Sequence, residues 1–132
     1  MYALAYIEER SVYGIIKSID GGFSWQLLME LEQQDGNYSR ILVDPNNSSI
    51  VYATGRGNIY KSTDACLNWK EIVNDPDSDV ILAIGRHRKS TILYAGFTDR
   101  NSSRILKSVD GGENWIDISG GFENPEDLKR PA

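Results

Sequence analysis

The stretch that decides the fold is Lys-Ser-Val-Asp-Gly-Gly-Glu-Asn-Trp at residues 107–115. Two related stretches precede it, KSIDGGFSW at 17–25 and KSTDACLNW at 61–69. Their serines, Ser18, Ser62 and Ser108, lie 44 and 46 residues apart, which is the length of a four-stranded propeller blade and also of some helical repeats. The three stretches therefore predict a repeat protein, and the residues between them decide between strand and helix.

Between these stretches, β-branched and aromatic residues occur in short runs separated by Gly, Asn, Asp and Ser, and no apolar spacing of 3.6 persists. Such runs are typical of short strands, so we predict an all-β chain of antiparallel units. Strands are expected at 41–43, 50–54, 58–62 and 69–73 in the second unit, and at 80–84, 92–97, 104–108 and 115–118 in the third. The first unit has only three expected strands, at 2–8, 13–18 and 25–29, so it lacks its first strand.

Each stretch contains the residues needed to close a turn between the last two strands of its unit. A Ser hydroxyl and an Asp carboxylate can bond to nearby backbone groups, Gly permits a positive φ, and a Trp can bury roughly 150 to 250 Å². Ala65 and Cys66 replace Gly-Gly in the middle stretch, at a cost of about 1 kcal/mol for a non-Gly residue at positive φ, so we expect that turn to change shape. The structural residues predicted in this way are Ser18, Asp20, Gly22, Trp25, Ser62, Asp64, Trp69, Ser108, Asp110, Gly112 and Trp115.

The three stretches resemble the Asp-box, or BNR repeat, Ser-x-Asp-x-Gly-x-x-Trp, of propellers in sialidases, xyloglucan-degrading glycosidases, sortilin-type receptors and the photosystem II assembly factor. The first and third stretches match this pattern in full. The resemblance implies an antiparallel β-propeller of about three blades within residues 1–119, at about 1–31, 38–74 and 79–119, with a polar tail at 120–132. Propellers close with four to eight blades, so the implied ring is incomplete. Either the chain is a segment of a longer propeller or several copies close a ring together.

Composition narrows the classes of partner and cofactor. With 14 Lys and Arg against 19 Asp and Glu, the formal net charge is −5, which disfavours nucleic acid as a partner. One cysteine, Cys66, and one histidine, His87, cannot form a zinc site, and we expect no metal and no cofactor. Neither a signal peptide nor an apolar run long enough for a membrane span is visible, so we expect a soluble chain without a membrane partner.

Candidate binding residues come from the geometry of a four-stranded meander. Its first and third turns lie at one end of the sheet, while its second turn and the connection to the next unit lie at the other. The second turns differ in length between the units, and variable loops on a fixed scaffold commonly carry recognition. The candidates at that end are Glu8, Glu9, Arg10, Ser11, Arg56, Asn58, Asp75, Asp77, Asp79, Asp99, Arg100 and Asn101, together with Gln33, Gln34, Asp35 and Asn37.

Carboxylates and arginines at one end of a propeller could serve a sugar site, since glycosidases use paired carboxylates and Arg binds anionic groups with two hydrogen bonds. The resemblance to sialidases implies an arginine triad, a tyrosine with a glutamate, and an aspartate from most of a six-bladed ring, which three units do not supply. We therefore expect no catalytic residue and predict a non-catalytic binding or scaffold module. Its expected partners are carbohydrate, protein, further blades of a longer chain, or copies of itself. The alternative is a fragment of a sialidase-like or xyloglucanase-like glycoside hydrolase.

Overall fold

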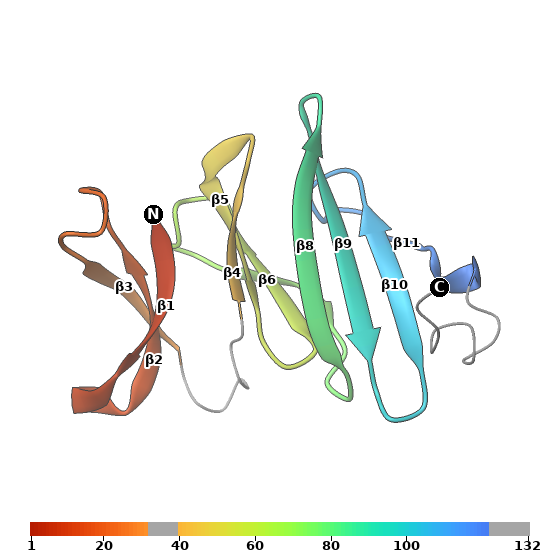
Figure 1. Cartoon of the computed structure of the whole chain (residues 1–132), viewed down its shortest axis with the longest axis horizontal. Coiled ribbons are helices and arrows are strands. Elements are labelled where there is room, and N and C mark those ends of the chain that lie inside the picture. Colours follow the sequence, from red (N-terminus) through yellow and green to blue (C-terminus); the bar gives the residue numbers. More distant parts are fainter. Residues whose placement is uncertain (32–39, 122–132) are drawn as a thin grey trace, which may run out of the picture.

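The computed structural model describes residues 1–31 and 40–121, which fold as three antiparallel sheets (Figure 1). The first sheet contains β1 (Tyr2–Ile7), β2 (Val12–Lys17) and β3 (Gln26–Leu31), with the short 3-10 helix η1 (Glu8–Arg10) between β1 and β2. The second contains β4 (Arg40–Asp44), β5 (Asn47–Thr54), β6 (Asn58–Ser62) and β7 (Lys70–Asn74). The third contains β8 (Asp79–His87), β9 (Ser90–Thr98), β10 (Ser103–Ser108) and β11 (Ile116–Asp117), and η3 (Ser119–Gly121) follows it.

The prediction of an all-β chain built from antiparallel units is confirmed. Each expected strand has a counterpart, and strands that neighbour one another in sequence pair within each sheet. The β8–β9 hairpin extends beyond the predicted ends because the pairing continues past the apolar residues to His87 and Ser90. The expected candidates Gln33, Gln34, Asp35 and Asn37 lie outside the described residues, as do 122–132 of the expected tail.

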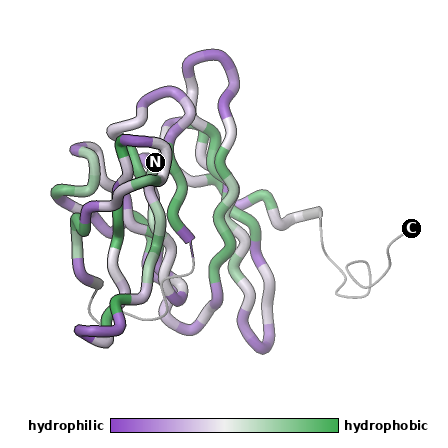
Figure 2. The backbone as a smooth tube through the Cα atoms, turned by 60° about the vertical axis from the view of Figure 1, so that its left-hand side comes forward, coloured by the Kyte–Doolittle hydropathy of each residue, from purple (hydrophilic) through white to green (hydrophobic). Residues whose placement is uncertain are grey.

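The three sheets follow one another along the long axis of the molecule (Figure 1). Side chains alternate between the two faces of a strand, so neighbouring residues of β5 contact different sheets. Val51 packs with Ile15 of the first sheet, whereas Tyr52 packs with Leu82 and Leu93 of the third. The second sheet is therefore covered on both faces. Figure 2 shows the resulting pattern, with hydrophobic segments within the strands and hydrophilic turns at both ends of the sheets.

A tyrosine and a lysine stand directly opposite each other on neighbouring strands, and this pair recurs in every sheet. It lies on β1 and β2 in the first sheet, on β5 and β6 in the second, and on β9 and β10 in the third. The pairs are Tyr2 with Lys17, Tyr52 with Lys61, and Tyr94 with Lys107. The three Lys Nζ atoms lie 5.4, 5.8 and 5.5 Å from the centroids of the respective tyrosine rings. The sheets therefore share one register, which allows equivalent positions to be compared between them.

Candidate functional site

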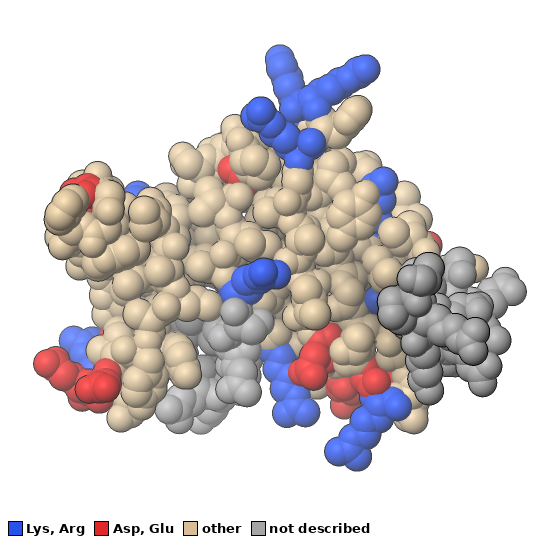
Figure 3. All heavy atoms as spheres, viewed as in Figure 1, with Lys and Arg blue, Asp and Glu red and all other residues tan. Residues whose placement is uncertain are grey.

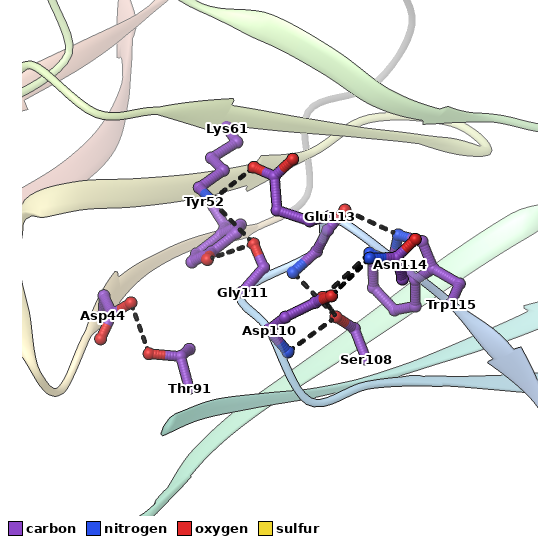
Figure 4. Close-up of polar contacts among 11 residues, drawn as sticks. Asp44, Tyr52, Lys61, Thr91, Ser108, Asp110, Gly111, Glu113, Asn114 and Trp115 are labelled. Atoms are coloured by element: carbon purple, nitrogen blue, oxygen red, sulfur yellow. Dashed lines mark hydrogen bonds and ion pairs between the residues drawn. The ribbon is translucent and has the colours of Figure 1, made fainter. Parts of the chain in front are cut away.

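Each of the three repeated stretches forms a turn closed by its own side chains, and we call these the Ser/Asp turns (17–25, 61–69 and 107–115). In the third, Gly112 N donates to Ser108 Oγ at 2.8 Å, and Ser108 Oγ donates to Asp110 Oδ1 at 2.8 Å (Figure 4). Asn114 N donates to the same carboxylate at 2.9 Å, and the Trp115 indole donates to Gly112 O at 3.1 Å. The first turn repeats this set of bonds through Ser18, Asp20, Gly22, Ser24 and Trp25.

The middle turn keeps the same shape, so the expected change of conformation is wrong. Ala65 and Cys66 adopt φ values of 57° and 73°, and Cys66 N donates to Ser62 Oγ at 3.0 Å. Hydrogen bonds worth about 1 kcal/mol each outweigh the backbone strain of the two residues. The difference lies in the indole, because Trp69 Nε1 is buried and has no hydrogen-bond partner among the described residues.

The third Ser/Asp turn docks on the second sheet through one backbone carbonyl. Gly111 O accepts a hydrogen bond from the Tyr52 hydroxyl at 2.8 Å and another from Lys61 Nζ at 2.9 Å (Figure 4). Burial, followed by the nearby carboxylate of Asp44, raises the pKa of Tyr52, so its hydroxyl remains a donor. A Cβ on Gly112 would lie 2.7 Å from Ile72 Cδ1, so the end of that side chain would have to move to admit a larger residue.

A second contact between these sheets joins their first hairpins. Thr91 Oγ1 donates to Asp44 Oδ2 at 2.6 Å (Figure 4). Asn46 Nδ2 donates to Thr91 Oγ1 at 3.1 Å. Sequence reasoning gave these residues and the Tyr52–Lys61 pair no role in joining the sheets. The sequence did contain one signal for the Tyr52–Lys61 contact, namely the lysine that begins every repeated stretch: Lys17, Lys61 and Lys107.

At the opposite end of the sheets, loops of the second and third sheets enclose a hollow of about 300 Å³, which we call the loop-end pocket. Gly57 adopts a φ of 73°, and a Cβ there would lie 1.8 Å from Asp75 O. Asp75 N donates to Gly57 O at 2.9 Å, so the loop after β7 lies directly against the loop after β5. The pocket is lined by Arg56, Asp77, Asp79, Thr98, Asp99 and Arg100.

Charged side chains gather at both ends of the sheets. Figure 3 shows acidic and basic side chains at the lower edge and basic side chains over the tip of the β8–β9 hairpin at the top. That tip carries Arg86, His87, Arg88 and Lys89, all exposed.

The structure brings together Arg56, Asp77, Asp79, Asp99 and Arg100 of the predicted binding residues. The other candidates within the described residues lie outside the pocket lining. Asp75 pairs with Arg104 at 2.7 Å, and the Asn58 amide donates to the Tyr60 hydroxyl at 2.9 Å. Asn101 lies in the β9–β10 loop, while Glu8, Glu9, Arg10 and Ser11 lie between β1 and β2 of the first sheet, where Arg10 pairs with Glu30.

Hydrogen bonds hold Asp99 in its ionised form. Its carboxylate accepts bonds from Asn101 N at 2.6 Å, Ser102 N at 2.6 Å and Ser102 Oγ at 2.9 Å. These bonds, first among them the one from the Asn101 backbone, lower the pKa of Asp99. Asp99 is therefore a fixed negative charge. Hydrogen bonding also lowers the pKa of the other described carboxylates with a resolved shift, Asp20, Asp64, Asp110 and Asp117.

Two other kinds of chemistry find little support in the described part of the chain. Burial raises the pKa of the Cys66 thiol to about 11, so the thiol is protonated at neutral pH and is a poor nucleophile. Residues 1–31 and 40–121 contain no group of three or more His, Cys, Asp or Glu side chains that could hold a metal ion. No helix within these same ranges has the length and apolar character to cross a bilayer.

Comparison with known proteins found no matching family model, no matching curated protein and no matching solved structure.

Replacing Ala65 by Gly is expected to stabilise the protein. The change removes about 1 to 2 kcal/mol of left-handed strain and gives back about 0.4 to 1 kcal/mol in unfolded-state entropy, for a net gain of about 0.5 kcal/mol in urea unfolding. The matched variant Gly111→Ala introduces the same strain and places a methyl group 3.2 Å from the Tyr52 hydroxyl, so it should lose more than 1 kcal/mol. Equal effects of the two substitutions would contradict this account of the turns.

Acid should destabilise the protein between about pH 4 and pH 2. Hydrogen bonds, first from the Ser24 hydroxyl and the Asn114 backbone respectively, lower the pKa of Asp20 and Asp110 from 3.8 to about 2. In this window the unfolded chain takes up protons that the folded chain does not, so the free energy of unfolding falls as the pH falls and is insensitive to these groups above about pH 5. Urea unfolding against pH should give a shallower slope for Asp110→Asn, and an unchanged slope would refute the assignment.

Proposed function

We propose that this chain is a non-catalytic segment of an Asp-box type β-propeller that acts as a binding or scaffold module. Three features support the proposal. The sheets follow one another face to face, the second and third sheets each contain four strands paired in chain order, and all three carry a Ser/Asp turn with the same serine and aspartate bonds. Stacked units of this kind bury their apolar faces against their neighbours.

The observation that carries the non-catalytic role is the hydrogen bonding of Asp99 in the loop-end pocket. A glycosidase of the two-carboxylate type needs one carboxylic acid whose pKa is raised, so that it can protonate the leaving group. Asp99 instead accepts three hydrogen bonds within its own loop, and its pKa is lowered. Such a group offers a permanent charge to a partner and no proton to a substrate.

The pocket favours a polar and charged partner. Arg56 and Arg100 are exposed in its lining, and an arginine can bind a carboxylate through two hydrogen bonds. Asp77 and Asp79 provide acceptors beside them. We propose that the loop-end pocket binds a carbohydrate or a protein segment, whose carboxylate the two arginines hold and whose hydroxyl or amide donors the aspartates accept.

The second candidate is a segment of a sialidase-like or xyloglucanase-like glycoside hydrolase. One observation favours it, because Asp77, Asp79 and Asp99 line the same hollow. In this alternative the carboxylates form a sugar cleft together with further sheets.

Hydrolysis assays and binding titrations separate the two candidates. We expect no turnover of an aryl glycoside panel that includes aryl sialosides, by the wild type or by Asp77→Asn and Asp99→Asn. Titration with sialyllactose and with an aspartate-rich peptide should shift the amide resonances of the pocket loops for at least one probe. Arg100→Ala should weaken that binding by at least threefold, whereas Arg86→Ala, at the opposite end, should leave it unchanged.

Two results would overturn the proposal. Hydrolysis by the wild type that disappears in Asp99→Asn would replace it with the glycoside hydrolase alternative. Binding that responds equally to Arg100→Ala and Arg86→Ala would remove the loop-end pocket as the binding surface.

A further inference from the structure

The contact between the second and third sheets defines what one sheet presents to the next. The second sheet contributes the Tyr52 hydroxyl and Lys61 Nζ, and the third contributes the Gly111 carbonyl that accepts from both. Around this point, Leu42 of the second sheet and Trp115 and Ala95 of the third belong to one apolar cluster. In this contact, two donors on one face meet the carbonyl of a Ser/Asp turn on the other.

The outer face of the third sheet, turned away from the second, carries the same donors in the same register. Tyr94 stands opposite Lys107 as Tyr52 stands opposite Lys61, yet Tyr94 is 42% exposed whereas Tyr52 is fully buried. Within the described part of the chain, neither the Tyr94 hydroxyl nor Lys107 Nζ makes a hydrogen bond, and Lys107 Nζ lies 5.5 Å from the centroid of the Tyr94 ring.

At two positions this outer face is also more apolar than the face of the second sheet that carries Tyr52 and Lys61. By strand register, Ile81 and Ile116 occupy the positions that Arg40 and Lys70 occupy on the second sheet. Both isoleucines are more than half exposed. Exposed aliphatic side chains beside two donors form a face suited to burial against another sheet.

The outer face of the first sheet carries the complementary half of the contact. Gly21 and Gly22 have φ values of 73° and 94°, close to the 70° and 93° of Gly111 and Gly112. A Cβ on Gly21 would meet nothing within 4 Å, so this turn is undocked. Trp25 and Phe23 are exposed beside it, and Ala3 occupies the register position of the buried Ala95.

We infer that the chain binds a second copy of itself head to tail, with the outer face of the third sheet of one copy docked on the outer face of the first sheet of the other. The inference rests on the proposed scaffold function and names its partner. The Tyr94 hydroxyl and Lys107 Nζ of one copy donate to the Gly21 carbonyl of the next. The contact joins two different surfaces, so it leaves one free copy of each surface until the assembly closes.

Pairing of two identical faces does not satisfy the same groups. Two third sheets placed face to face would bring donors together without an acceptor, because the Gly111 carbonyl of each is already bonded to Tyr52 and Lys61. Two first sheets would leave both Gly21 carbonyls without donors. The head-to-tail arrangement alone matches donors with an acceptor and covers both exposed apolar faces.

Mixing two blocked variants tests this arrangement. Ala83→Arg places a charge at the centre of the outer face of the third sheet, opposite Tyr94, and Ala3→Arg does the same on the first sheet. Ser48→Arg, in the exposed β4–β5 hairpin region, is the control. Circular dichroism checks that all variants fold.

Sedimentation equilibrium of the full chain should show assemblies of two or more copies for the wild type and for Ser48→Arg. Each blocked variant alone should be monomeric. Their equimolar mixture should form dimers, because the intact first sheet of one variant can still bind the intact third sheet of the other. Lys107→Ala should weaken the wild-type association by roughly 3- to 10-fold, since it removes one donor.

Two outcomes would overturn the inference: a monomeric wild type at about 100 μM, a concentration near the weak end of specific association, or a mixture of folded blocked variants that stays monomeric. Assembly and hydrolysis are separate readouts. A monomeric chain without hydrolysis would reject the head-to-tail contact and leave the binding-module proposal standing. Hydrolysis by an assembled chain would support the head-to-tail contact and reject the non-catalytic proposal.

Discussion

One backbone carbonyl links the second and third sheets. Gly111 O accepts from both the Tyr52 hydroxyl and Lys61 Nζ, and it can do so because its turn is held open by side chains. Ser108 and Asp110 satisfy the backbone amides of the turn, so the carbonyl of Gly111 is left free to point at the neighbouring sheet. The hydrogen bonds that close the turn therefore also position the carbonyl that docks it on the second sheet.

The glycine positions of the turns differ in how closely the neighbouring sheet approaches them. A Cβ on Gly112 would lie 2.7 Å from Ile72 Cδ1, whereas Ala65 and Cys66 fit in the middle turn despite their positive φ. Cys66 is itself buried against Ile15 and Val51, so its side chain contributes apolar contact between the first and second sheets. Strain in the backbone is offset by burial and by the bonds of Ser62 and Asp64.

The sequence was sufficient for the strands and for the residues that close the turns, because both depend on local pattern. Short runs of β-branched and aromatic residues predicted the antiparallel units, and the spacing of Ser18, Ser62 and Ser108 predicted the repeat. The loop-end pocket was predicted only in part, since the loops that carry Arg56 and Asp77 are brought together by a close backbone approach of Gly57 to Asp75 that no spacing reveals. The partners of Tyr52 and Thr91 lie 59 and 47 residues away, so pattern alone could not pair them.

Unfolding of two tyrosine variants tests the docking of the sheets most directly, in an Ala3→Arg background that prevents assembly. Tyr52 and Tyr94 occupy the same register position, but only Tyr52 donates to a Gly carbonyl of the next sheet. The account predicts that Tyr52→Phe lowers the free energy of unfolding by about 1 kcal/mol and that Tyr94→Phe changes it by less than about 0.5 kcal/mol. Equal losses for the two variants would contradict it.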